Sequence, residues 1–539
     1  MLRKFLILFA LLVAAVAAPH FLYSYRNYNL LLITIDTLRA DYLSCYNSAA
    51  LPTPNLDRIA KEGIVFTQAY SLIPITLPSH SAILSSRPPH DVLVFNNGDI
   101  YGTRTPLLAD DMSRAGYRTA AFVSLAVLKS AFGLNRGFQS YSDDFGRQRW
   151  YRLASEVNDV ALPWIEKNKD SRFFAWIHYS DPHEPYITFD APPDTELYVH
   201  GKLHSKFCMA KKERNVLHFD AHPGENKLLL RALRQVPHLV DRLVVKPDTG
   251  IELVYGDGWK ERQAGRGKDR YFDDRADVTI INNNRRRTPI RVSFRGDIDQ
   301  TIDEIRRNYA AEVQYVDKNI GVLWQRLEQL KLLGNTIIIL TGDHGEGLGT
   351  HDRIGHLFPL YREITQVPLL IYYPHLGRSG KRVHALVNHM DIKPTALDLL
   401  HLKSGAPMLG QSLKRYVSWS PVDFLFTRKP DRSRTFISTF APQGRSNSFA
   451  MIHQNLKMIE TRAKSEWKWE AYDLKTDPAE VRDLMRLEPA RLRSLQFESL
   501  RPLLEEYARE AERAQGSHKN PELSDEQKRM LRDLGYVAP

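Results

Sequence analysis

The sequence predicts an α/β protein: a doubly wound, mostly parallel sheet flanked by helices, with an inserted β-rich module and a small C-terminal α+β subdomain. Short apolar runs alternate with helical segments in the first part of the chain, and this alternation is typical of parallel sheets. The alternation stops near Asp190, gives way to short strand-like runs, and resumes near residue 300. With 539 residues the chain is long enough for roughly two to four units.

The first strand is the apolar run 30–35, which ends at Asp36. Such continuous runs are typical of strands that are buried on both faces of a parallel sheet. A helix follows, because Thr53 can cap it, Pro54 suits its first turn and Gly63 stops it. The first α/β part, residues 27–190, is completed by strands at 64–66, 119–123 and 173–178 and by helices starting near 76 and at 106–115 and 154–168.

Residues 191–299 are predicted to form the inserted β module, because short alternating runs are separated by turn sequences such as Asp-Thr-Gly and Asn-Asn-Asn. The second α/β part, residues 300–405, opens with a long amphipathic helix whose apolar residues recur at helical spacing from Ile302 to Leu330. The other elements expected are strands at 335–340 and 367–372, a helix at 391–400, a C-terminal subdomain at 406–512 with strands at 436–439 and 456–460, and a charged, loosely packed tail at 513–539.

The N-terminal segment, residues 1–26, is predicted to be a signal peptide or a membrane anchor. Arg3 and Lys4 precede an apolar run at 5–18, and a basic flank before a short apolar core is typical of export signals. The run is short for a membrane span, so a cleaved signal and an uncleaved anchor are both open. Either one predicts an exported protein that is periplasmic or otherwise outside the cytoplasm.

The net charge of +11 comes from basic residues that are scattered along the chain. This scatter does not favour nucleic acid as a partner, whereas a surface that meets an anionic substrate, a glycan or a lipid headgroup fits it. The two cysteines, Cys45 and Cys208, form no C-x-x-C unit, so neither a zinc knuckle nor a disulfide framework is expected.

Two acidic residues and a histidine are predicted to meet at one edge of the sheet. Asp36 ends the first strand, and Asp343 and His344 come just after the strand at 335–340. Ligands of parallel sheets bind beyond the carboxyl ends of the strands, so the fold would bring these side chains together. They suit a divalent metal such as zinc or manganese, with calcium and magnesium also open. For Asp36 alone, a turn or cap residue is the alternative interpretation.

Thr76 is the candidate nucleophile and a further metal ligand. It begins Thr-Leu-Pro-Ser-His, and Pro78 and Ser79 suit the N-terminus of a helix. There its hydroxyl would lie beside unpaired backbone N–H groups and the positive end of the helix dipole, which favour a phosphate or sulfate group. A metal would lower the pKa of this hydroxyl. The alternative is an ordinary threonine N-cap.

Histidines gather at the ends of predicted strands and on the loops that follow them, namely His178, His183, His344, His351 and His356. We expect His183, within Asp-Pro-His-Glu-Pro-Tyr, and His356 to act in catalysis, by binding anionic oxygens or by protonating the leaving group. We expect His80 and His351 to contact the substrate. A structural or exposed histidine is the alternative at each position.

These motifs together resemble the alkaline phosphatase/sulfatase superfamily over residues 29–190 and 300–405. The stretches that carry the resemblance are Ile-Thr-Ile-Asp-Thr-Leu-Arg-Ala-Asp at 33–41, Thr-Pro-Asn-Leu-Asp at 53–57, residues 76–87, Phe-Gly-Leu-Asn-Arg-Gly-Phe at 132–138, residues 181–186, residues 341–345, and Tyr-Asp-Leu at 472–474 with Asp-Pro at 477–478. The resemblance implies an alkaline phosphatase-like fold, a divalent metal and a nucleophile that attacks phosphorus or sulfur.

The sequence departs from the sulfatase pattern at three positions. Sulfatases carry a cysteine or serine nucleophile that is oxidised to formylglycine, whereas Thr76 cannot be converted to that aldehyde, so no formylglycine is expected. His80 stands where sulfatases have an arginine, and Thr37 stands where they have a second aspartate. A threonine nucleophile looks more like the phosphodiesterase and the phosphoglycerol or phosphoethanolamine transferase branches.

These observations predict a metal-dependent hydrolase or transferase that cleaves an anionic ester, with a phosphodiester favoured, through a phosphothreonine intermediate on Thr76. One alternative is a sulfuric ester hydrolase that works without formylglycine. Another is an inactive sulfatase-like scaffold that binds glycan or protein through the β insert, but the presence of Asp36, Thr76, Asp343 and His344 argues against it. The arginine run at 285–287 is either a site for acidic polysaccharide or lipid headgroups, or a solvated loop.

Overall fold

The computed structural model describes residues 28–531 of the chain, with gaps. The gaps are 147–148, 185, 187–194, 201, 208–213, 233–237, 247–248, 250, 258, 265–266, 273–274, 299–300, 357–358, 375–378, 418–434, 441–446, 463–466, 519–522, 526 and 529–530. The predicted signal or anchor, residues 1–26, therefore lies outside the described residues. Within the part of the chain that is described, no helix is both long and apolar enough to cross a membrane. The chain divides into two compact units, Met1–Pro182 with Val313–Pro539, and His183–Glu312.

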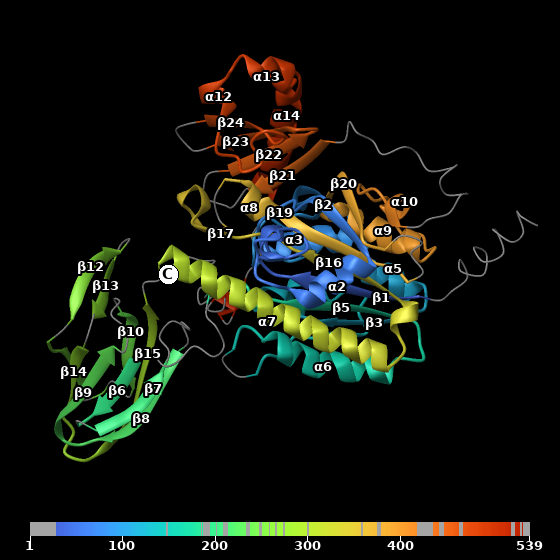
Figure 1. Ribbon diagram of the computed structural model, residues 1–539. Helices are drawn as coiled ribbons and strands as arrows, with labels where there is room; N and C mark the ends of the chain where they lie inside the picture. Colours follow the sequence, from blue (N-terminus) through green and yellow to red (C-terminus); the bar gives the residue numbers. More distant parts are fainter. Residues whose placement is uncertain are drawn as a thin grey trace, which may run out of the picture. The chain divides into compact units, whose positions relative to one another are not determined.

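The first unit is built on an eight-stranded, mostly parallel sheet (Figure 1). In spatial order its strands are β20 (Lys381–Asn388), β2 (Ile64–Tyr70), β19 (Gln366–Tyr372), β16 (Thr336–Gly342), β1 (Asn29–Ile35), β5 (Phe173–Tyr179), β3 (Arg118–Phe122) and β4 (Ser140–Ser142). Neighbouring strands are parallel except at β19, which runs antiparallel to both β16 and β2. The predicted mostly parallel α/β sheet is therefore confirmed.

Helices cover both faces of this sheet, as in a doubly wound fold (Figure 1). Alternate residues of β1 point to opposite faces, and Leu30 and Leu32 pack in the larger core with Phe174 and Trp176 of β5. The helices that contribute to this core are α3 (Thr76–Ser85), α5 (Leu108–Arg114) and α9 (Ile392–Leu399). The helices of the opposite face are α2 (Pro54–Glu62), α6 (Ala154–Lys167) and, from residue 313 on, α7 (Ile302–Gln329).

Two differences from the predicted elements of this unit are the strand β20, which no predicted element covers, and the length of β2. This strand continues to Tyr70 rather than ending at 66, because a bulge beside Thr67 lets polar residues join the pairing with β20. Thr53 precedes α2 as predicted, but its side chain does not cap the helix; its Oγ1 accepts a hydrogen bond from the Ser44 N–H at 3.1 Å. The shorter elements are α4 (Pro89–Val92), β17 (Gly347–Leu348), β18 (Ile354–Gly355), α8 (Arg362–Thr365), α10 (Lys414–Val417), α12 (Leu484–Leu487) and α13 (Arg491–Ser494).

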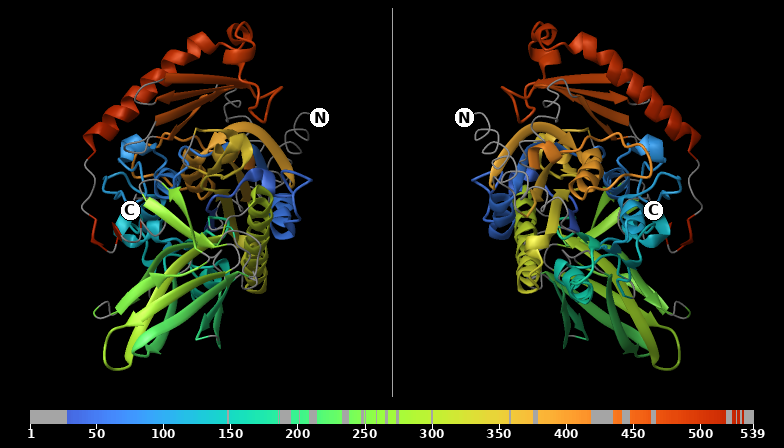
Figure 2. Two further views of the ribbon diagram at one scale, coloured as in Figure 1. Left: turned by 90° about the vertical axis from the view of Figure 1, so that its left-hand side faces the viewer. Right: turned by 90° about the vertical axis from the view of Figure 1, so that its right-hand side faces the viewer.

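The C-terminal subdomain of the first unit is an antiparallel sheet covered by a long helix (Figure 2). The sheet consists of β21 (Thr435–Phe440), β22 (Asn447–His453), β23 (Leu456–Arg462) and β24 (Trp467–Asp473), and the helix is α14 (Phe497–Ser517). The prediction of a loosely packed tail is wrong for the described part of 513–539, since α14 continues to Ser517 and Leu531 is buried in the larger core. Apolar residues at helical spacing, Leu504, Ala508 and Ala511, pack α14 on the sheet among its many charges.

The second unit is a β-sandwich. One sheet has the order β12 (Lys260–Ala264), β13 (Gly267–Phe272), β10 (His238–Lys246), β15 (Thr288–Ile298) and β8 (Arg214–Ala221). The other has the order β11 (Ile251–Tyr255), β14 (Arg275–Asn282), β9 (Gly224–Ala232), β6 (Thr195–Val199) and β7 (Lys202–Phe207). Leu228 and Ile280 of one sheet share a core with Ile290 and Val292 of the other. The predicted insert, residues 191–299, lies within this unit.

Candidate metal and active site

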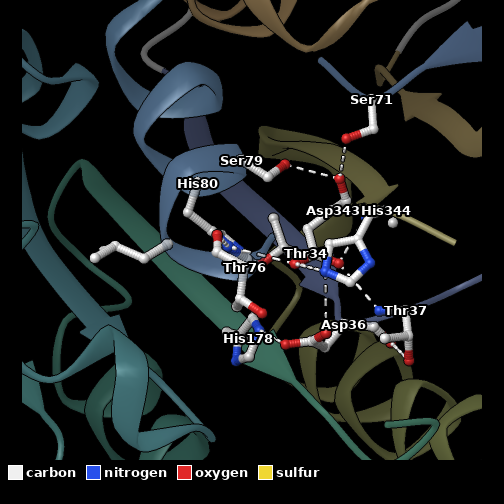
Figure 3. A network of polar contacts seen from close by, with 12 residues as sticks. Thr34, Asp36, Thr37, Ser71, Thr76, Ser79, His80, His178, Asp343 and His344 are labelled. Atoms are coloured by element: carbon white, nitrogen blue, oxygen red, sulfur yellow. Dashed lines mark hydrogen bonds and ion pairs between the residues drawn. The ribbon is translucent and has the colours of Figure 1, made fainter. Parts of the chain in front are cut away.

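The carboxyl ends of three neighbouring strands bring the predicted acidic residues together. The Asp36 N–H, just after β1, donates to the Tyr179 carbonyl at the end of β5 at 2.8 Å, and the Asp343 N–H, just after β16, donates to the Ile35 carbonyl at 3.2 Å. Asp36, Asp343 and His344 are all buried, and one possible ligand atom from each lies within 4.8 Å of the other two (Figure 3). Residues more than 300 positions apart in the chain thus form one cluster.

Backbone N–H groups orient the Asp343 carboxylate. Its Oδ1 accepts hydrogen bonds from the Thr37 N–H at 3.0 Å and from the His344 N–H at 2.7 Å. Thr37 has a φ of 54°, an uncommon conformation for a β-branched residue, and this turn directs its N–H at Asp343. No hydrogen-bond partner among the described residues reaches Asp343 Oδ2, which therefore faces the cluster.

The cluster fits a divalent metal ion. His344 Nδ1 lies 3.0 Å from the Gly345 carbonyl, which can only accept, so Nδ1 carries the proton and Nε2 keeps its lone pair. This Nε2 lies 3.8 Å from Asp36 Oδ1 and 3.5 Å from Asp343 Oδ2. Burial and the neighbouring Asp36 carboxylate raise the pKa of Asp343 well above its usual range, and a bound cation would offset both effects. Asp36, Asp343 and His344 would hold the ion.

Thr76 is the first residue of α3 and is completely buried. The cap residue of α3 is Ile75, and the Thr76 side chain makes no capping hydrogen bond, so the ordinary N-cap interpretation does not apply. Among the described residues, none forms a hydrogen bond with Thr76 Oγ1. Figure 3 shows the side chain directed toward those of Asp36 and His178. The hydroxyl therefore lies at the positive end of a helix and beside the acidic cluster.

His80 is brought to the site but is placed differently from the predicted substrate contact. Its Nδ1 donates to the Thr76 carbonyl at 2.8 Å, and its Nε2 lies 3.0 Å from Thr34 Oγ1, which accepts from Trp176 Nε1 and so donates to His80. Burial and the nearby His178 hold the pKa of His80 well below its usual range, so the ring is neutral. Both ring nitrogens are thus occupied in bonds that brace Thr76 against β1.

His356 lies at the site and His351 does not. The His356 ring centroid is 4.5 Å from that of His344, and its Nδ1 lies 3.2 Å from the Glu346 carboxylate. His351 is placed differently from the predicted substrate contact, because its Nδ1 lies 2.7 Å from Glu363 Oε1 and its Nε2 lies 2.8 Å from the Glu480 carbonyl. Nδ1 of His351 thus contacts α8 and Nε2 contacts the C-terminal subdomain, so the ring joins these two parts of the first unit.

His183 is the first residue of the second unit. Its Nδ1 donates to the Glu184 carbonyl at 2.7 Å, and its assignment as a catalytic residue stays a prediction. Asp181, two positions earlier, is buried just after β5, and its Oδ1 accepts from the N–H of Ala154, the first residue of α6, at 3.0 Å. Burial raises the pKa of Asp181 to about 7.

Two further residues of the site have no assigned role in the sequence motifs. His178, on β5, has its Nε2 3.6 Å from Asp36 Oδ2, and its Nδ1 lies 2.8 Å from Ser124 Oγ. Ser124 follows β3, the strand beside β5. The position of His178 and Ser124 at the carboxyl ends of predicted strands is the sequence signal that indicates a role in the site. However, a histidine on a strand with no recognisable motif is equally consistent with a core residue.

Two family models match the chain. The model described as Sulfatase matches residues 28–402, and the model described as N-sulphoglucosamine sulphohydrolase, C-terminal, matches residues 354–505. Among similar proteins, the N-acetylglucosamine-6-O-sulfatase of Bacteroides thetaiotaomicron is 24% identical over 488 residues, which cover 85% of this chain and 82% of that protein. The iduronate 2-sulfatase of Homo sapiens is 24% identical over 406 residues, which cover 71% of this chain and 68% of that protein.

Solved structures share the fold. A protein in complex with its substrate D-glucosamine-2-N,6-O-disulfate superposes with a TM-score of 0.61 at 20% identity, over 90% of this chain and 98% of the other. The phosphonate monoester hydrolase of Agrobacterium radiobacter superposes with a TM-score of 0.57 at 19% identity, over 90% of this chain and 96% of the other.

Proposed function

The chain belongs to the sulfatase family, and from this premise we propose that it cleaves an anionic ester, a phosphodiester first of all, through a covalent intermediate on Thr76. It is a hydrolase of sulfuric or phosphoric esters, as its relatives and structural neighbours are. The proposal rests on one observation: a buried threonine hydroxyl, with no hydrogen-bond partner among the described residues, begins a helix beside two buried carboxylates and an imidazole.

The proposed reaction has two steps, and both take place at Thr76. Thr76 Oγ1 bonds to phosphorus, its proton passes to water, and the bond from phosphorus to the leaving oxygen breaks. Water, or an acceptor alcohol in a transferase, then attacks the phosphorus and breaks its bond to Oγ1. A divalent metal, when bound, supplies positive charge that acidifies a hydroxyl and stabilises the transition state.

His356 is proposed to protonate the leaving oxygen. Because its Nδ1 faces the Glu346 carboxylate, that nitrogen keeps its proton, and Nε2 is the atom that exchanges a proton with the substrate. His183 is proposed to share this role or to bind the anionic oxygens. His80 acts differently: with both nitrogens bonded within the protein, it holds the backbone of Thr76 in place.

A phosphodiester is favoured because the nucleophile is threonine. Formylglycine is made from cysteine or serine, and Thr76 is neither. A threonine hydroxyl that attacks the phosphorus of a diester gives a phosphothreonine that keeps the second ester group. Water then releases a phosphomonoester and returns the proton to Thr76 Oγ1, and the threonine needs no prior modification. The phosphonate monoester hydrolase among the structural neighbours supports phosphorus chemistry on this fold.

Sulfate-ester hydrolysis on a sugar is the second candidate. The relatives named above are sulfatases, and one structural neighbour is described with a disulfated glucosamine as its substrate. The same cluster of metal ligands and the same helix terminus suit a sulfate as well as a phosphate. On this candidate, an anionic glycan is the substrate and Thr76 attacks sulfur.

Turnover of matched chromogenic substrates by wild type, Thr76→Ala and Thr76→Ser tests the proposal. We expect Thr76→Ala to lose phosphodiester turnover by about 10³–10⁶-fold, as nucleophile removal does, while Thr76→Ser keeps part of it through its hydroxyl. Mass spectrometry of quenched wild type is expected to show, on the peptide that contains Thr76, one phosphoryl group that still carries the second ester group of the diester. Sulfate-ester turnover without phosphodiester turnover selects the second candidate, and undiminished turnover by Thr76→Ala contradicts both.

A further inference from the structure

His178 lies between the site and the neighbouring strand β3. It is completely buried on β5, directly opposite Thr34 in the pairing with β1. Its Nε2 lies 3.6 Å from Asp36 Oδ2, and its ring is 4.9 Å from that of His80 at an edge-on angle of 77° (Figure 3). The ring is thus held between His80 and the end of β3.

The hydrogen bonds of His178 define its tautomer. The Ser124 N–H lies 3.3 Å from His178 Nδ1, and a backbone N–H can only donate, so Nδ1 is the acceptor. Ser124 Oγ, at 2.8 Å, also donates to it. With Nδ1 as the acceptor, the ring proton is on Nε2, the nitrogen that lies 3.6 Å from Asp36 Oδ2. An imidazole nitrogen that carries a proton does not ligate a metal, so His178 is not a fourth ligand.

We propose that His178 is a positioning residue for the metal ligand Asp36, with Ser124 setting its tautomer. The Nε2–H of His178 draws Oδ2 of Asp36 to one side and leaves Oδ1, which is 3.8 Å from His344 Nε2, toward the ion. Asp343 is arranged in the same way, with Oδ1 held by two backbone N–H groups and Oδ2 facing the cluster. Each carboxylate thereby presents one oxygen to the metal.

This inference rests on the metal site of the proposed function, and metal affinity tests it without turnover. Metal-free full-length protein is titrated with Mn²⁺ and Zn²⁺ by calorimetry, as wild type, His178→Phe, His178→Gln and Ser124→Ala. Mutation of a residue that orients a metal ligand typically lowers metal affinity by about 10–100-fold, so we expect His178→Phe to weaken metal binding by about tenfold or more. His178→Gln, whose amide nitrogen can take the place of Nε2, is expected to restore most of it.

Thermal unfolding of the same metal-free variants separates positioning from packing. His384→Gln is the matched control, since His384 is an exposed histidine on β20 that contacts Thr67. The proposal is overturned if His178→Phe binds metal as tightly as wild type, if His178→Gln is as weak as His178→Phe at equal melting temperature, or if wild type binds neither ion. The titration contains no substrate, so it tests the role of His178 separately from the covalent mechanism. Loss of turnover in Thr76→Ala with unchanged metal affinity would be consistent with the role of His178. Full turnover in Thr76→Ala would contradict only the covalent mechanism.

Discussion

At the scale of single residues, backbone hydrogen bonds decide which oxygen of a carboxylate faces the site. Asp343 is the clearest case, since its Oδ1 is occupied by the N–H groups of Thr37 and His344. Holding Thr37 at a φ of 54° costs the chain conformational energy, on the order of 1–3 kcal/mol for a non-glycine residue, and the rest of the sheet edge must stabilise it. Such strain is expected where geometry serves function rather than stability.

Asp181 gives a prediction at this scale. Burial raises its pKa to about 7, so the folded protein binds a proton that the unfolded chain releases near the ordinary value of 3.8. The stability that this proton contributes is present below about pH 4 and is lost as the pH rises through about 7. Asp181→Asn keeps the acceptor for the Ala154 N–H but has no proton to lose, so its free energy of unfolding is expected not to show this fall. Relative to wild type, its free energy of unfolding is expected to rise by up to about 4 kcal/mol between low and high pH. Urea unfolding at several pH values measures it, and parallel curves for the two proteins would contradict the prediction.

At the scale of elements, the loop between β17 and β18 connects the sheet edge to the C-terminal subdomain. His351 contacts Glu363 and the Glu480 carbonyl, and Glu480 in turn accepts from the buried Lys457 at 2.8 Å. Glu346 and His356 lie at the two ends of this segment and contact each other, and the His356 ring lies beside that of His344. A histidine with one nitrogen bonded to α8 and the other to the C-terminal subdomain therefore anchors the segment that carries the proposed proton donor.

The His351 contact predicts a pH-dependent anchor. The hydrogen bond to Glu363 raises the pKa of His351 above 6.5, so its stabilising effect is fully present below that value and is lost as the pH rises through the folded pKa. We expect His351→Gln to lower the free energy of unfolding by about 1–2 kcal/mol near pH 6 and by less near pH 9. Denaturant unfolding at both pH values measures the difference, with His384→Gln as control. An equal loss at both would show that the charge of His351 has no part in the anchor.

At the scale of the whole molecule, the two units have separate hydrophobic cores. The sandwich core is built from residues such as Leu228, Ile280 and Val292, all within His183–Glu312. The larger core of the first unit contains Leu32 and Ile339 from the central strands. Units with cores of their own can in principle unfold separately, so a single transition is not the expected behaviour of this chain.

Matched core substitutions test this separation. Ile280 and Ile339 are both buried isoleucines in central strands, one in each unit. Replacing either by alanine removes buried methyl groups and is expected to cost about 2–5 kcal/mol in its own unit. Calorimetry is expected to show that Ile280→Ala lowers the melting temperature of one transition and leaves metal affinity unchanged, whereas Ile339→Ala lowers the other. A single transition that both variants lower equally would contradict independent cores.

The sequence by itself predicted the central strands β1, β5, β16 and β19 and the residues that follow two of them. Continuous apolar runs marked the buried strands. The residues after them, Asp36 and Asp343, were predicted to lie together and to suit a metal, because strand ends of a parallel sheet share one edge, and the structure places them in one cluster. Thr76 was placed at a helix start by local punctuation alone. These signals are local in sequence, so they need no knowledge of packing.

Only the tertiary structure decided how each side chain is used. His80 on α3, His178 on β5 and His351 after β17 are used differently: the first braces Thr76, the second faces Asp36 and the third contacts the C-terminal subdomain. Their partners lie on other strands and loops, often more than a hundred residues away in the chain. A side chain's role follows from the donors and acceptors around it, and packing between distant segments, rather than local pattern, brings those groups together.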